Sequence, residues 1–115
     1  MRDIEHRIQT ACVKWFRYAY PRLSLRLVAI PNGGARNIST AARLKEEGVV
    51  AGVSDLVLFL PRHGYGALCI EMKTNKGRQS DSQKAWQEAI QGEYLYVICR
   101  SLDDFIKIIN AYIKG

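Results

Sequence analysis

The feature of the sequence that most constrains its fold is the segment 67–74, in which apolar and other side chains alternate. A period of two predicts a β-strand, because successive side chains of a strand point to opposite faces. One predicted face carries Glu71 and Lys73, and the other is formed by Leu68, Ile70 and Met72. The segment therefore predicts a strand with one face in an apolar core and charges on the other face.

The elements around this strand predict a mixed sheet that is flanked by helices. Residues 67–99 follow the order strand, helix, strand, which is typical of a right-handed parallel crossover. The preceding strand is joined to 67–74 by a turn at 62–66, so the two predict an antiparallel hairpin. We expect helices at 3–19, 39–47, 82–91 and from Ser101 onward, and strands at 23–30, 53–60, 67–74 and 94–99. The expected fold class is α/β, in a single domain that spans residues 1–115.

Composition and charge narrow the class of protein. The chain has 115 residues, of which 48% are hydrophobic and 24% charged, and this is ordinary globular composition. Its longest apolar runs, 49–53 and 56–60, are far shorter than the roughly 20 residues of a membrane-spanning helix, and no signal peptide is visible. We therefore expect no membrane partner. A net charge of +6 fits a polyanionic partner, and three widely spaced cysteines without a C-x-x-C pair predict buried free thiols in an intracellular, reducing compartment.

The sharpest chemical signal joins Asp55 to the charged face of 67–74. Asp is disfavoured in strands, yet Asp55 stands near the start of the apolar strand 53–60. Asp55 lies opposite Glu71 if the numbers of paired residues sum to an even value such as 126, and it faces away if the sum is odd. We expect the even register. A Glu and a Lys two positions apart also fit an exposed strand face with a weak ion pair.

Two carboxylates side by side predict a cation site. At about 4 Å they repel by about 4 kcal/mol at an effective dielectric constant of about 20, so the fold should avoid the arrangement unless a cation occupies it. Oxygen ligands with room for water suit Mg²⁺ or Mn²⁺. The expected ligands are Asp55, Glu71 and the main-chain carbonyl of Met72, and such a metal could activate a water and neutralise a phosphate oxygen. Lys73 could orient that water or stabilise the transition state.

Several short motifs follow one another with a specific spacing. In chain order they are Glu5 near the edge of the apolar arc of the first helix, the turn 31–34, then 52–56, 70–74, the basic loop 76–78, and Gln83 with Trp86. This pattern, which extends from Glu5 to about Tyr112, resembles the PD-(D/E)XK nuclease superfamily and, more narrowly, the VRR-NUC family of virus-type replication-repair nucleases. Ser54 stands where the superfamily name has Pro, a residue that supplies no ligand.

The resemblance implies a restriction-endonuclease-like core and divalent-metal-dependent hydrolysis of DNA phosphodiester bonds, with 5′-phosphate products and Mg²⁺ or Mn²⁺ as the cofactor. On the matching positions it implies that Asp55 and Glu71 bind the metal and that Lys73 is the catalytic lysine. It also implies that Gln83 is the accessory glutamine that follows the E-x-K strand. Glu5 would support the metal site, or its water, from the first helix.

Basic side chains near these motifs are candidate phosphate contacts. They are Arg36, Arg43, Lys76, Arg78 and Lys84. Asn32 lies in a turn that could form a backbone nest for phosphate, although the sequence alone favours a plain turn. Each real contact should add about −0.9 to the slope of log affinity against log salt on duplex DNA.

The resemblance also has implications for substrate and assembly. A chain of 115 residues has no room for a separate recognition module, which favours recognition of DNA structure. Stand-alone viral members resemble Holliday-junction resolvases and act as homodimers, so four-way or other branched DNA and a homodimer are expected, with the apolar last helix as one candidate interface. The compartment would be the cytoplasm of a bacterium or of a virus-infected host cell. Two alternatives are a non-catalytic DNA-binding module on the same fold and a restriction-type nuclease with a short recognition sequence.

Overall fold

The computed structural model of the chain describes residues 2–31 and 38–115. The elements in chain order are α1 (Arg2–Ala19), a 3₁₀ helix η1 (Pro21–Arg26), β1 (Leu27–Ala29), α2 (Ile38–Glu46), β2 (Leu56–Leu58), β3 (Leu68–Met72), α3 (Asp81–Ile90), β4 (Leu95–Cys99) and α4 (Leu102–Lys114). Apart from η1, this is the order of helices and strands that the sequence predicts. The structure is an α/β fold, as expected.

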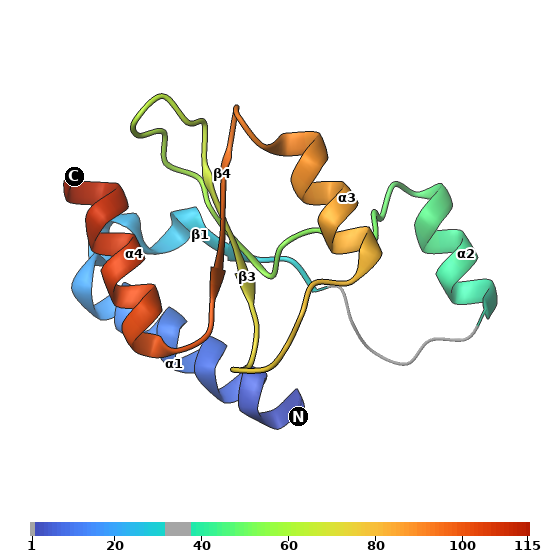
Figure 1. The fold of residues 1–115 in the computed structure, drawn as a ribbon, viewed down its shortest axis with the longest axis horizontal. Coiled ribbons are helices and arrows are strands. Elements are labelled where there is room, and N and C mark those ends of the chain that lie inside the picture. Colours follow the sequence, from blue (N-terminus) through green and yellow to red (C-terminus); the bar gives the residue numbers. More distant parts are fainter. Residues whose placement is uncertain (1, 32–37) are drawn as a thin grey trace.

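In the described part of the chain, four strands form one mixed sheet in the order β1-β2-β3-β4 (Figure 1). β2 runs antiparallel to both β1 and β3, whereas β3 and β4 are parallel. The predicted hairpin and the predicted parallel crossover are therefore confirmed. Helices α1 and α4 cover one face of the sheet, α3 covers the other face, and α2 stands apart from the sheet (Figure 1).

Strand β3 separates two apolar clusters of different size. The larger cluster lies on the side of α1 and α4, and it includes Cys12, Phe16, Leu68, Ile70, Met72, Phe105, Ile109 and Tyr112. The smaller cluster lies under α3 and consists of Val57, Ala67 and Cys69 with Ile30, Trp86, Ile90 and Tyr96 around them. The alternation in 67–74 thus distributes side chains between the two faces as the period of two predicts.

The predicted strand at 23–30 is wrong in its first half, where η1 is found, and only Leu27–Ala29 pairs with β2. Pro21 occupies the start of η1, where its fixed φ suits a helical turn. Leu23 donates its amide hydrogen to the carbonyl of Tyr20, which closes that turn. The leucines at alternate positions fit the pattern of a strand, but Leu25 is 94% exposed and contributes nothing to a core.

Side-chain caps fix the starts of the last two helices. The Ser80 hydroxyl accepts from the Gln83 amide in a capping box, so α3 begins at Asp81, one residue before the predicted start. The Ser101 hydroxyl accepts from the Asp104 amide at 3.1 Å, and α4 begins at the next residue, Leu102. The Asp104 carboxylate, however, accepts from the Arg100 amide. The helix therefore begins with a variant of the capping box, in which the acid accepts from the residue before the cap.

Three further expectations concern apolar side chains and thiols. All three cysteines are free and buried, as predicted. Within residues 2–31 and 38–115 there is no helix with the length and hydropathy needed to cross a membrane. Three side chains of α4, those of Phe105, Ile109 and Tyr112, are buried in the core of this chain. They are consequently not available as a dimer interface.

Candidate active site

The hairpin register places Asp55 opposite Glu71. Leu56 pairs with Ile70, so the numbers of paired residues sum to 126. The predicted even register is confirmed. Because side chains alternate along both strands, Asp55 and Glu71 share the face of the sheet that α3 covers.

Asp55 is held at the start of β2 by its own backbone and side chain. Its carbonyl accepts from the Ile30 amide at 2.8 Å, which extends the β1–β2 ladder to this position. Its Oδ2 accepts from the Met72 amide at 2.7 Å. The buried Ser54 hydroxyl donates to the Leu56 carbonyl at 3.0 Å and so secures the residue before Asp55. The carboxylate is thereby fixed between β2 and the end of β3.

Glu71 is a carboxylate buried inside the domain, and its side chain is 3% exposed. Its Oε2 accepts from Gln83 Nε2 at 2.9 Å and lies 3.7 Å from Lys73 Nζ. Its Oε1 is buried and has no hydrogen-bond partner among the described residues. A buried oxygen without a partner is costly, so this atom marks a position where the protein alone leaves the site incomplete.

The surroundings of Glu71 disfavour its charged form. Burial, together with the carboxyl of Asp55 and the charge of Glu5, raises the pKa of Glu71 to about 8, although Lys73 acts to lower it. Glu5 belongs to α1 and is partly buried, so the first helix brings a third acidic group within electrostatic range of Glu71. Excess negative charge in a buried place is the condition under which a cation is most stabilising.

Gln83 has two roles in the structure. Its Oε1 accepts from the Ser80 amide at 2.8 Å, which completes the capping box of α3. Because this bond fixes the orientation of the amide group, Nε2 is the end that donates to Glu71. The helix cap therefore also orients a donor toward the buried carboxylate.

Gly52 brings the segment before Asp55 against the start of α3. Its φ is +89°, a conformation that favours glycine, and a Cβ at this position would lie 2.3 Å from the carbonyl oxygen of Ser82. Such a contact is impossible for a side chain beside a backbone atom. The absence of a side chain at Gly52 thus allows Asp55 and Gln83 to meet at one site.

Residues 3–103 match the VRR-NUC domain. The chain belongs to the VRR-NUC family. A solved structure titled "VRR_NUC domain protein" is similar to it, with a TM-score of 0.83 and 28% sequence identity over 96% of this chain and 88% of that one. No curated protein matches the chain. The VRR-NUC family is a family of nucleases, so Asp55, Glu71 and their neighbours lie in a nuclease domain.

The donors of this VRR-NUC domain fit an oxygen-liganded divalent cation. Asp55 and Glu71 supply carboxylate oxygens, and Glu71 Oε1 lacks a partner. Within residues 2–31 and 38–115, no group of three or more His, Cys, Asp or Glu side chains is arranged to hold a metal ion. Two carboxylates with a carbonyl and water suit Mg²⁺ or Mn²⁺ better than zinc, which prefers nitrogen and sulfur ligands.

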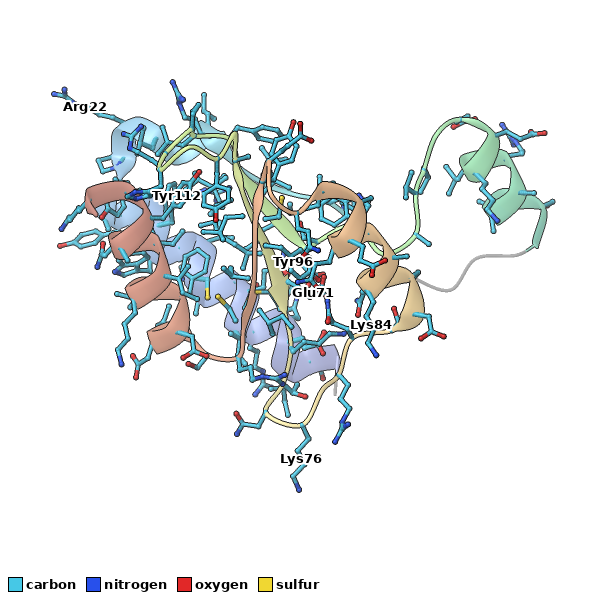
Figure 2. The ribbon with its side chains drawn as sticks, turned by 45° about the horizontal axis from the view of Figure 1, so that its top comes forward. Arg22, Glu71, Lys76, Lys84, Tyr96 and Tyr112 are labelled. Atoms are coloured by element: carbon cyan, nitrogen blue, oxygen red, sulfur yellow. The ribbon has the colours of Figure 1, made fainter. Side chains whose placement is uncertain are left out.

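The basic residues predicted to contact phosphate are spread over the VRR-NUC domain. Lys84 projects from α3, whereas Lys76 projects from the loop after β3 (Figure 2). Arg78 is exposed in the same loop. Arg43 belongs to α2, which stands apart from the sheet (Figure 1). Asn32 and Arg36 lie outside the described residues.

Sequence reasoning missed two groups near the site. Arg100 follows β4 and donates to carbonyls of the loop that precedes α3. Gln79 donates to Gln87 at 2.9 Å and to the Tyr96 hydroxyl at 3.1 Å, and burial raises the pKa of Tyr96. Tyr96 lies close to Glu71 in Figure 2. No local motif marks these residues, because the sheet register and the path of the loop bring them to the site.

Proposed function

We propose that this chain is a divalent-metal-dependent DNA endonuclease. The observation that carries the proposal is the buried Glu71, which has one oxygen without a partner, the Asp55 carboxylate opposite it and the Lys73 ammonium beside it. A fold that only needed stability would replace such a group by an apolar side chain. Perturbed carboxylates of this kind are typical of functional sites.

The proposed roles follow from what each side chain contacts. Asp55, Glu71 and the Met72 carbonyl would hold Mg²⁺ or Mn²⁺, which supplies Lewis-acid polarisation of a phosphate oxygen and of a water. Gln83 keeps Glu71 oriented through its hydrogen bond to Oε2. Lys73 is 13% exposed, so its ammonium can orient the attacking water and stabilise the negative charge of the transition state. Glu5 adds negative charge from α1.

The proposed substrate is DNA with a branch, such as a four-way junction. The net charge of +6 and the exposed cations Lys76, Arg78 and Lys84 support binding to the phosphate backbone, and Arg43, Arg36 and Asn32 are proposed as more distant contacts. Two copies related by a two-fold axis would suit paired incisions in a junction. The three buried free thiols support a site of action in a reducing, intracellular compartment.

A cleavage assay on labelled DNA tests the activity. The wild type, Asp55→Asn and Lys73→Ala are incubated with a four-way junction and a linear duplex in Mg²⁺, Mn²⁺ or EDTA. We expect metal-dependent cleavage with preference for the junction, and a loss of about 10²-fold or more in both variants. Lys107→Ala, an exposed lysine on α4, is the matched control and should cleave like the wild type.

Each of the other outcomes contradicts the proposal in a different way. DNA binding without cleavage, equal in the wild type and the variants, would indicate a non-catalytic module. Discrete sequence-defined cuts on linear plasmid would indicate a restriction-type nuclease. Cleavage that persists in EDTA, or in Asp55→Asn at the wild-type rate, would exclude the proposed metal ligands.

The homodimer is proposed to form at the β1–β2 side of the sheet. Val28 and Phe59 are 37% and 54% exposed, and the register places them on the same face. Sedimentation should show a dimer for the wild type and a monomer for Phe59→Asp. Leu25→Asp, which changes an exposed leucine of η1, is the control and should remain dimeric. A monomeric wild type would refute the dimer, and a dimeric Phe59→Asp would refute this interface.

A further inference from the structure

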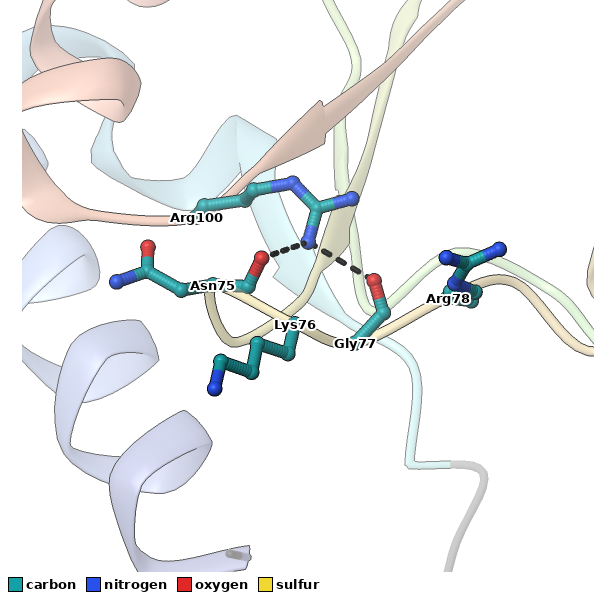
Figure 3. Close-up of a pocket in the computed structure, with 5 residues that line it drawn as sticks. All are labelled: Asn75, Lys76, Gly77, Arg78 and Arg100. Atoms are coloured by element: carbon teal, nitrogen blue, oxygen red, sulfur yellow. Dashed lines mark hydrogen bonds between the residues drawn. The ribbon is translucent and has the colours of Figure 1, made fainter.

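The loop between β3 and α3 forms a positively charged hollow beside the site. The hollow has a volume of about 590 Å³ and is lined by Asn75, Lys76, Gly77, Arg78 and Arg100 (Figure 3). Four of these residues follow Lys73 within five positions, and Arg100 arrives from the end of β4. The hollow is thus built from two segments that leave neighbouring parallel strands.

One nitrogen of Arg100 fixes the shape of this loop. Nη1 donates to the carbonyls of Thr74 at 2.6 Å, Gly77 at 2.8 Å and Asn75 at 3.3 Å, and two of these bonds are drawn in Figure 3. Because three carbonyls of the loop accept from the same nitrogen, the loop is held in one shape around Arg100. The remaining nitrogens of the guanidinium, Nη2 and Nε, have no hydrogen-bond partner among the described residues.

The charge of the hollow is not neutralised within the domain. Among the described residues, Lys76, Arg78 and Arg100 form no ion pair, and the Asp104 carboxylate bonds only to the backbone amide of Arg100. Three cations around one hollow repel one another unless an anion is present. A guanidinium whose Nη1 donates to carbonyls still has the N–H groups of Nη2 and Nε, and these two donors match the geometry of a phosphate.

The hollow is in contact with Lys73. A Cβ on Gly77 would lie 3.3 Å from Cδ of Lys73, so the backbone of the loop packs on the lysine side chain. Lys73 Nζ lies 3.7 Å from Glu71. Consequently, a nucleic-acid strand at the proposed catalytic centre would carry its next phosphates past the hollow.

We propose that this hollow is a subsite for a backbone phosphate of the DNA strand, bound by Arg100, Lys76 and Arg78. Arg100 contributes twice, because Nη1 holds the loop and the other nitrogens face the phosphate. The proposal deepens the proposed nuclease function, on which it rests for the identity of the ligand. It assigns a role to Arg100, which no motif in the sequence indicates.

Binding to a fluorescent DNA duplex in EDTA, measured at several salt concentrations, tests the subsite without requiring cleavage. Arg78→Gln should make the slope of log affinity against log salt less negative by about 0.9, the contribution of one phosphate contact. Arg100→Gln should make the slope less negative by more than the contribution of one contact, because the loop is released as well. Arg100→Lys keeps the charge but not the fork, so its affinity should fall between those of the wild type and Arg100→Gln. Lys107→Gln on α4 is the control for loss of one exposed charge.

A double-variant cycle tests whether Arg100 holds the loop in place or only adds positive charge. In the Arg100→Gln background, Arg78→Gln should cost less affinity than it does in the wild type, because the loop no longer presents Arg78. Where cleavage is measurable, Arg100→Gln should raise KM for DNA more than it lowers kcat. Melting temperatures report whether each variant folds, and the exposed pair Lys76→Gln with Arg78→Gln tests the hollow if Arg100→Gln does not fold.

Two results would overturn the subsite. In the first, Arg100→Lys and the Lys76/Arg78 double variant bind DNA with the affinity and salt slope of Lys107→Gln. In the second, the wild type does not bind DNA in EDTA. A wild type that binds through the hollow but never cleaves would refute the nuclease proposal and leave the subsite standing.

Discussion

The two faces of β3 use the same strand in opposite ways. On the α1–α4 face, Leu68 and Ile70 are completely buried among apolar side chains, so burial there is favourable without any partner. On the α3 face, Glu71 is equally hidden but carries a carboxylate that faces Asp55. Burial therefore has opposite effects on stability at the two faces. Buried apolar side chains on the α1–α4 face stabilise the fold, whereas the buried carboxylate on the α3 face lowers stability and forms part of the site.

The largest effect on stability is expected on the apolar face. Phe105 in α4 is fully buried and packs edge-on against Trp15 at a ring distance of 6.0 Å. Phe105→Ala should lower the free energy of unfolding by about 3–5 kcal/mol, because it leaves a cavity in the core. Urea denaturation measures the change. A loss of under about 1 kcal/mol would mean that α4 is not a core element.

The opposite sign is expected on the α3 face. Glu71→Gln keeps the shape of the side chain and removes a charge that is buried without full pairing. In metal-free protein at pH 8 or above, it should raise the free energy of unfolding by about 1–3 kcal/mol, the cost of one unsatisfied buried group. The same variant should lose cleavage activity. Destabilisation by this substitution would contradict the contrast between the faces.

The pH dependence of stability sharpens the same contrast. Burial raises the pKa of Glu71 to about 8, so the folded state favours the protonated carboxyl. The stability that comes from this group is fully present below the unfolded pKa of about 4.5 and is lost as pH rises toward 8. The metal-free wild type should therefore lose unfolding free energy relative to Glu71→Gln as pH rises through this window. Denaturation series at fixed salt measure it, and a wild type that gains stability relative to Glu71→Gln as pH rises would be inconsistent with a buried, unfavourable Glu71.

The smallest effect on stability is expected at Gln83, which lies at the start of α3 and contacts the site. Gln83→Ala removes the side-chain half of the capping box and the donor to Glu71. The unfolding free energy should fall by about 1 kcal/mol, a typical value for a helix cap. Ser80→Ala disturbs the cap but leaves the Gln83 donor, and so serves as the control. If Gln83 positions Glu71, Gln83→Ala lowers kcat whereas Ser80→Ala changes it little.

Much of the site could be predicted from the sequence because it depends on local patterns. The period of two in 67–74 fixed which side of β3 carries Glu71, and the parity of the hairpin determined whether Asp55 joins it. Residues 23–30 show the limit of such patterns, because alternating leucines fit a 3₁₀ turn after Pro21 as well as a strand. Periodicity cannot distinguish the two when the strand is only three residues long.

Other parts of the site depend on contacts between distant segments. Gly52 is needed because the backbone of Ser82 approaches it, and nothing in 50–54 indicates that approach. Arg100 meets the loop at 74–77 only because β4 pairs in parallel with β3. Gln83 carried a usable signal, since Ser80 and Gln83 have the spacing of a capping box.

The most direct test of the central claim is the position of Mn²⁺ in a crystal of the wild-type protein, located by its anomalous scattering. We expect a peak between the side chains of Asp55 and Glu71, with Glu71 Oε1 among the ligands. We also expect that the peak is absent from crystals of Asp55→Asn grown under the same conditions. Mn²⁺ bound elsewhere, with this pair of carboxylates free of metal, would contradict the account.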